Sequence, residues 1–84
     1  MQRFFFHVVN DTSATMDEDG TLLPDLDAAC KEARKIIGAI IADELREGRD
    51  VLHLAVMIDD AHGHRVGKVA TVTQVTTEAT ARGA

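Results

Sequence analysis

The hydrophobic positions between residues 26 and 47 recur every three or four residues, which predicts one long amphipathic helix. Its apolar stripe consists of Leu26, Ala29, Cys30, Ala33, Ile37, Ile40 and Ile41. Asp25 is a favourable N-cap because its carboxylate accepts backbone N–H bonds in the first turn. A start at Asp27 is the alternative, in which case Asp27 is the cap. Gly48 is typical of the residue that ends a helix in the left-handed conformation.

Alternating side chains predict a half-buried β-strand at residues 3–9. One face of this strand carries Phe4, Phe6 and Val8, and the other carries Phe5, His7 and Val9. After a turn at residues 10–13, residues 14–16 are predicted to form a short return strand. Residues 21–24 are predicted to be extended, because Pro24 disfavours helix at the residue before it.

The second half of the chain predicts another pair of strands. Residues 51–60 alternate, with one face made of Leu52, Leu54, Val56 and Ile58 and the other of Val51, His53, Ala55 and Met57. Residues 65–75 are rich in Val and Thr, and they are predicted to return as the partner strand after a turn. Residues 76–84 lack a packing pattern and are predicted to be a frayed C-terminal tail.

Two strands, a helix and two strands predict a single α+β domain at residues 1–75, with the arrangement ββαββ. If the two hairpins join through the first and third strands, the antiparallel sheet has the order 2-1-3-4. The single long helix then packs on one face of this sheet and leaves the other face open.

Charge placement argues against nucleic-acid binding. The formal net charge is -5, and the excess lies before residue 31, where six acidic residues accompany a single base, Arg3. Neutralising phosphates requires a face rich in Lys and Arg, which this sequence lacks. Cys30 is the only cysteine, so no internal disulfide forms. No membrane-spanning stretch and no signal-peptide pattern is present, so a cytoplasmic location is expected.

Two motifs resemble those of a family of short bacterial proteins of unknown function. The first is a strand of the form R-[YF]-F-F-H-[VL], and the second is a helix start of the form D-x-x-G-x-x-x-[PA]-[DS]-L-x-x-A-x-x-x-A. The matching positions are Arg3, Phe4, Phe5, Phe6, His7, Val8, Asp17, Gly20, Pro24, Asp25, Leu26, Ala29 and Ala33, with Asp60, Gly63 and Val66 in the closing turn and strand. The resemblance runs from Arg3 to about Val72 and implies no activity. Gly67 and Lys68 depart from the more apolar last strand of the family.

The histidines are the main candidates for chemistry. His7 lies in an apolar strand, where it is either a ligand or general base, or a structural side chain held by hydrogen bonds. If the first and third strands are neighbours, His7 and His53 approach each other, but a zinc site needs further ligands. His62 and His64 are interpreted as solvated turn residues.

The remaining candidates are interpreted as structural. Residues 17–20 lack the spacing of an EF-hand loop and are interpreted as a turn whose carboxylates accept backbone N–H bonds. Cys30 lies in the apolar stripe and is interpreted as a small buried side chain. No catalytic residue, cofactor site or metal site is therefore predicted, and the sequence does not indicate an enzyme.

The open face of the sheet is predicted to be a homodimer interface, because monomers rarely expose a large apolar patch. The candidate interface residues are Phe5, His7, Val9, His53, Ala55 and Met57, and Val51 and Val69 are placed on the same face. Edge-to-edge pairing of strands is the alternative geometry. The predicted function is that of a small binding or regulatory module acting through protein contacts. The alternative is a nucleic-acid-associated regulator of antitoxin type, because Pro24, Asp25, Leu26, Ala29 and Ala33 also resemble an antitoxin-type helix start.

Overall fold

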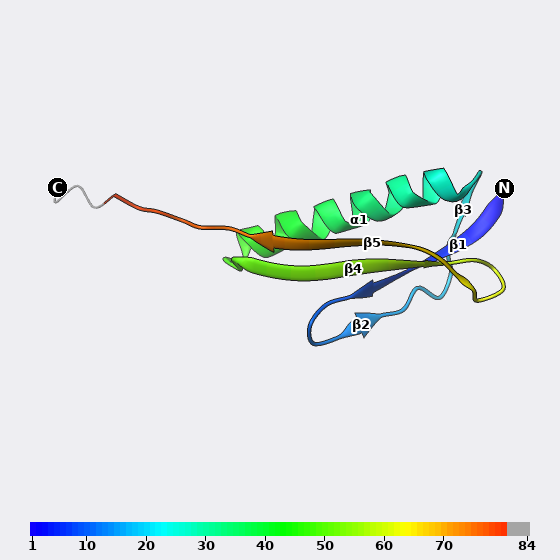
Figure 1. Cartoon of the computed structure of the whole chain (residues 1–84), viewed down its shortest axis with the longest axis horizontal. Coiled ribbons are helices and arrows are strands. Elements are labelled where there is room, and N and C mark those ends of the chain that lie inside the picture. Colours follow the sequence, from blue (N-terminus) through cyan, green and yellow to red (C-terminus); the bar gives the residue numbers. More distant parts are fainter. Residues whose placement is uncertain (81–84) are drawn as a thin grey trace.

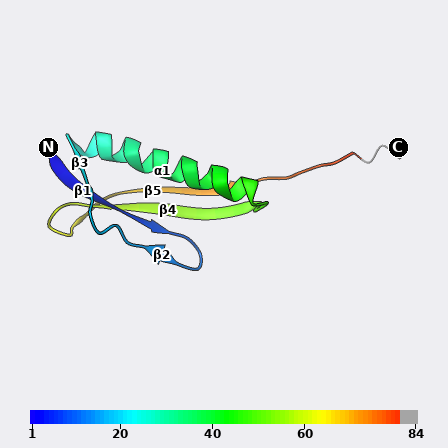
Figure 2. The same ribbon diagram turned by 180° about the vertical axis from the view of Figure 1, so that it is seen from behind.

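One helix lies along one face of an antiparallel sheet in the computed structural model of the protein, which describes residues 1–80 (Figure 1). The elements follow the order β1 (Gln2–Val9), β2 (Ala14–Thr15), β3 (Thr21–Leu23), α1 (Leu26–Arg46), β4 (Val51–Asp59) and β5 (Arg65–Gln74). The predicted α+β class is confirmed. Seen from behind, β4 and β5 run below α1, whereas β3 and the start of β1 rise beside its first turns (Figure 2).

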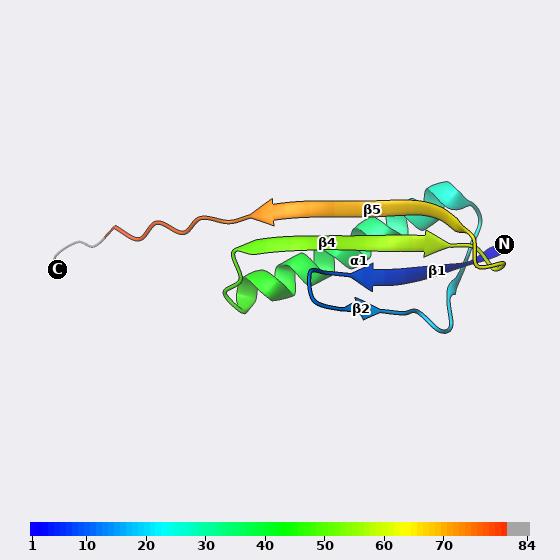
Figure 3. The same ribbon diagram turned by 60° about the horizontal axis from the view of Figure 1, so that its bottom comes forward.

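The sheet has the strand order β2-β1-β4-β5, and every pair of strands is antiparallel (Figure 3). A fifth strand, β3, pairs with the start of β1, where Arg3 lies opposite Leu22. The predicted order 2-1-3-4 therefore describes four of the strands and lacks β3, which the sequence predicted only as an extended segment. β4 is central, because it pairs with β1 on one side and with β5 on the other.

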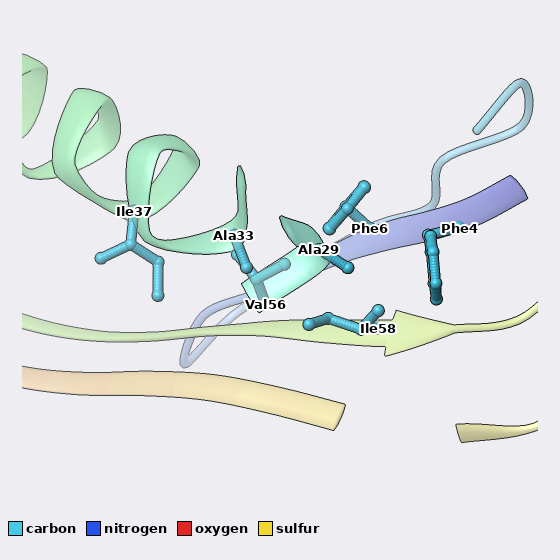
Figure 4. Packing of buried hydrophobic residues seen from close by; sticks show 7 residues of the cluster. All are labelled: Phe4, Phe6, Ala29, Ala33, Ile37, Val56 and Ile58. Atoms are coloured by element: carbon cyan, nitrogen blue, oxygen red, sulfur yellow. The ribbon is translucent and has the colours of Figure 1, made fainter. Parts of the chain in front are cut away.

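The hydrophobic core lies between α1 and the sheet (Figure 4). Its cluster consists of the buried side chains Phe4, Phe6, Ala29, Ala33, Ile37, Val56 and Ile58. Ala29 and Ala33 have no exposed surface, and their small size lets the helix approach β4 and β5 closely. Leu52 and Leu54 are also buried. The predicted core faces of the first and third predicted strands are therefore confirmed.

The two ends of α1 are closed by capping interactions. Asp25 is the N-cap, and its Oδ1 accepts the backbone N–H of Ala28 at 2.8 Å. The alternative start at Asp27 is therefore wrong. After the C-cap, Glu47, the chain turns at Gly48, which has a φ of +88° and donates its N–H to the Leu45 carbonyl at 3.1 Å. Within the described residues, no helix is long and apolar enough to cross a membrane.

β5 places Val69 on the helix side of the sheet, opposite Val56. The placement of Val69 on the open face was therefore wrong. Because β5 has apolar residues on both faces, alternation alone does not show which face is inner. Residues 76–80 belong to no helix or strand, and the rest of the predicted tail, residues 81–84, lies outside the described residues.

Candidate functional site

The sheet face that α1 does not cover, here called the open face, carries all six candidate interface residues. On β1 and β4 it is formed by the odd-numbered positions, and on β5 by the even-numbered ones from Lys68 to Gln74. Cross-strand neighbours form rows across it: Val9 lies opposite Ala55, which lies opposite Ala70. In the next row, Met57 lies between His7 and Lys68.

Among residues 1–80, His7 is the one buried residue with a polar side chain, with 8% of its surface exposed. Its Nδ1 accepts the backbone N–H of Asp17 at 3.1 Å, and its Nε2 lies 3.2 Å from Oδ2 of Asp59. Because Nδ1 accepts a hydrogen bond, the proton of the neutral ring is on Nε2 and is donated to the carboxylate. Both ring nitrogens are therefore occupied by the protein itself.

Asp17 ties the loop between β2 and β3 to β1. Its Oδ2 accepts the backbone N–H of Phe6 at 3.1 Å, and its Oδ1 accepts those of Asp19 at 3.2 Å and Gly20 at 3.0 Å. Burial by itself raises the pKa of this carboxyl, but these N–H groups and nearby His7 outweigh it and hold the pKa below its ordinary value. The ionised carboxylate is thus the form that fits this loop.

Gly20 allows the same loop to lie against β1. Its φ is +72°, and a Cβ there would lie 2.9 Å from the Phe4 carbonyl oxygen and 2.9 Å from Cγ of Arg3. The Arg3 guanidinium in turn donates to the Asp19 carbonyl at 2.8 Å. Arg3 and His7 of β1 therefore contact one loop, residues 17–20, here called the strap, which covers His7.

Asp59 connects His7 to the far hairpin. Its Oδ1 accepts from Nε of Arg65 at 2.6 Å, next to a β-bulge at Ile58 and Asp59. The hydrogen bond from Arg65 lowers the pKa of Asp59, and although burial raises it, the charge of Arg65 and the contact with His7 keep it below its ordinary value. The His7 side chain thus lies between the strap and this hairpin.

This geometry supports the structural interpretation of His7. A general base needs a free lone pair that a substrate reaches, whereas Nδ1 of His7 is turned to a backbone amide under the strap. Among residues 1–80, no three His, Cys, Asp or Glu side chains are grouped closely enough to hold a metal ion. The partners of His7 were missed from the sequence, because Asp59 is brought to it only by the pairing of β1 with β4.

His53 does not approach His7, so that expectation was wrong. β1 and β4 are neighbours, but the register places Met57 opposite His7, four positions along β4 from His53 and thus roughly 13 Å away at the usual strand rise. His53 is exposed, and its Nδ1 lies 3.3 Å from Oδ1 of Asp11.

The remaining candidates lie apart from this unit. Asp60 accepts the backbone N–H groups of His62 at 2.8 Å and His64 at 2.9 Å, so the His-x-His segment is a turn closed by a carboxylate, and both rings are exposed. The bond from His64 lowers the pKa of Asp60 most, and although burial raises it, the bond from His62 helps to hold it below its ordinary value. Cys30 is half-buried beside the core cluster.

The accessible part of the open face is smaller than the sequence predicted and is shifted toward β5. His7 is covered by the strap, and the Phe5 ring is half-buried next to Gly20. Sequence reasoning missed two exposed residues of β5, Ala70 and Val72, and 76% of the Val72 surface is exposed. The apolar residues of the open face that are exposed or half-buried are here called the apolar patch: Val9, Ala55, Met57, Ala70 and Val72. A hollow of about 270 Å³ lies over much of it.

The sequence matches one protein family over most of its length. The family model described as Domain of unknown function (DUF6894) matches residues 3–73, which include all but one residue of β1 and all but one of β5. No curated protein and no solved structure matches the chain. The resemblance seen in the sequence agrees with this match at the level of a domain of unknown function. The chain therefore belongs to the DUF6894 family.

Proposed function

We propose that this protein is a small binding or regulatory module that acts through protein contacts and self-associates as a homodimer. The observation that supports this is the apolar patch on the open face of the sheet, next to β5. One helix covers one face, and the apolar patch remains on the other, with Val72 76% exposed. Monomeric proteins rarely leave contiguous apolar surface of this kind in water, and two-fold homodimers are the commonest way to bury it.

Two geometries accommodate self-association. In the first, which the sequence predicted, open face meets open face over Val9, Ala55 and Met57. In the second, copies pair edge to edge along β5. Both bring a second copy against Ala70 and Val72, which border the open face and the free edge of β5. Nucleic-acid binding has less support, because a net charge of -5 repels phosphate.

Sedimentation velocity over a range of micromolar concentrations tests the homodimer. We expect a concentration-dependent shift from 9.1 kDa to twice that mass. Val72→Asp should weaken the dimer at least about tenfold, because it puts a carboxylate into the apolar patch and next to the partner strand. Leu22→Asp is the matched control, since Leu22 is also exposed but lies on β3. A 9.1 kDa species at every concentration would contradict the proposal.

A further inference from the structure

β5 is a free sheet edge whose outward-facing groups are identified by one hydrogen bond. Val75 donates its backbone N–H to the Asp50 carbonyl at 2.7 Å, which continues the register that pairs Val51 with Gln74. In an antiparallel ladder, alternate residues direct their N–H and C=O groups to opposite sides. The groups of Lys68, Ala70, Val72 and Gln74 therefore point away from β4, where no other described strand pairs with them.

The composition of this edge favours pairing with another strand. From Val69 to Thr77 the chain has no charge, no Pro and no Gly, and most of its residues are Val or Thr. Natural edge strands are usually protected by such interruptions, and a segment without them is a template for a further strand. The chain also runs on beyond β5 in line with it, past the start of β4 (Figure 3).

An apolar groove follows the same edge on the helix side. It has a volume of about 310 Å³ and is lined by Arg34, Ile37, Gly38, Ile41, Val69, Ala70 and Thr71. Gly38 lies in the middle of α1, where glycine costs about 1 kcal/mol relative to alanine. A Cβ at Gly38 would meet no atom within 4 Å, so packing within the chain does not require glycine there. Its lack of a side chain widens the groove toward solvent.

We propose that a second copy of this chain pairs antiparallel along β5 about a two-fold axis at Thr73. The proposal rests on the homodimer proposed above and places the second copy at the β5 edge and not on the open face. Lys68 and Glu78 are equally distant from Thr73 along the chain and are the nearest charged residues on either side of it. In this register Lys68 of each copy lies opposite Glu78 of the other, which gives two cross-strand ion pairs.

The same register fills the groove. Val75 of the second copy lies opposite Thr71, and its Thr77 lies opposite Val69. Odd-numbered positions of β5 face the helix side, so both partner side chains enter the space beside Ile37 and Gly38. The two helices then lie on the same side of one continuous sheet, which is the result of a two-fold axis perpendicular to that sheet.

Disulfide trapping tests the position of the axis. Thr73 directs its N–H toward β4, so two Thr73 residues across the axis form a non-hydrogen-bonded pair with a Cα–Cα distance of about 4.5 Å. That distance permits a disulfide. In a Cys30→Ala background, Thr73→Cys should form a covalent dimer on mild oxidation. Thr71→Cys is the matched control. Thr71 lies opposite Val75 of the second copy, so the two Thr71 residues of the dimer are far apart and the variant should not form a disulfide.

Ala55→Cys distinguishes the two dimer geometries, because Ala55 lies on the open face and Thr73 on the helix side. A dimer by sedimentation that links through Ala55→Cys and not through Thr73→Cys would overturn the edge pairing and leave the proposed function standing. Linkage through Thr71→Cys would also overturn the register. A protein that is monomeric at all concentrations would contradict both proposals.

A charge exchange tests the register without cysteines. Lys68→Glu puts like charges opposite each other twice in the dimer, and it should raise the dimer dissociation constant about tenfold. Adding Glu78→Lys should restore the dissociation constant of the unmodified chain, whereas Asp50→Lys, which alters an acidic residue outside the pair, should not. The register would be contradicted if Lys68→Glu alone left the dissociation constant unchanged. It would also be contradicted if adding Glu78→Lys failed to restore that constant.

Discussion

At the scale of single residues, the contacts of the strap account for Arg3, Asp17 and Gly20. Each of these residues makes a contact that holds the loop before β3 against β1. One ring nitrogen of His7 contacts the strap and the other contacts Asp59. These residues therefore hold a loop in place against the first strand.

Gly20→Ala should destabilise the protein by about 2–4 kcal/mol. A φ of +72° by itself costs an L-residue about 1–2 kcal/mol, and the added Cβ would meet the backbone oxygen of Phe4 at 2.9 Å. Gly63→Ala is the matched control, because Gly63 has a φ of +80° but a Cβ there would meet nothing within 4 Å. Urea unfolding at a fixed protein concentration measures both. Equal losses in the two variants would show that the contact with β1 is unimportant.

At the scale of elements, α1 begins at a capped N-terminus that the sequence located. Asp25→Ala should reduce the free energy of unfolding by about 1 kcal/mol, because the Ala28 N–H loses its acceptor. Asp27→Ala is the control: Asp27 is exposed in the first turn and pairs only loosely with Lys31 at 3.8 Å. A larger loss of unfolding free energy for Asp27→Ala than for Asp25→Ala would show that Asp27, and not Asp25, caps the helix.

The elements that the sequence predicted well are those with a periodic pattern. The spacing of apolar residues predicted α1 to within one residue of its end at Arg46, and alternation identified the inner faces of β1 and β4. β3 was missed as a strand because three residues, Thr21–Leu23, are too few to show a period. The contacts of His7 were missed because sheet register joins residues far apart in the chain.

At the scale of the whole molecule, stability should fall in acid. Asp17 and Asp59 have pKa values below ordinary in the folded protein, whereas unfolded Asp titrates near 3.9. Their contribution is therefore complete above the unfolded pKa, and it is lost as the pH falls through the lower folded values. Urea unfolding at pH 7 and pH 3 should show a marked loss at pH 3.

Asp17→Asn isolates the part of this effect that belongs to the strap. One amide oxygen cannot replace both carboxylate oxygens toward Phe6, Asp19 and Gly20, so we expect a loss of about 1–3 kcal/mol at pH 7. The difference from the unmodified protein should shrink at pH 3. Glu18→Gln is the control, since Glu18 is exposed in the same loop. A difference that stays constant with pH would assign the loss to packing and not to ionisation.

The central position of β4 has a consequence for synthesis on the ribosome. β1 is made first, but the strand that pairs along its second half, Val51–Asp59, is translated only after the whole of α1. Until then the nascent chain can form only local structure, namely the helix and the pairing of β1 with β2 and β3, and Phe6 lacks the neighbours that bury it. The apolar side chains of β1 therefore stay uncovered until β4 emerges, and only then can the core between helix and sheet close.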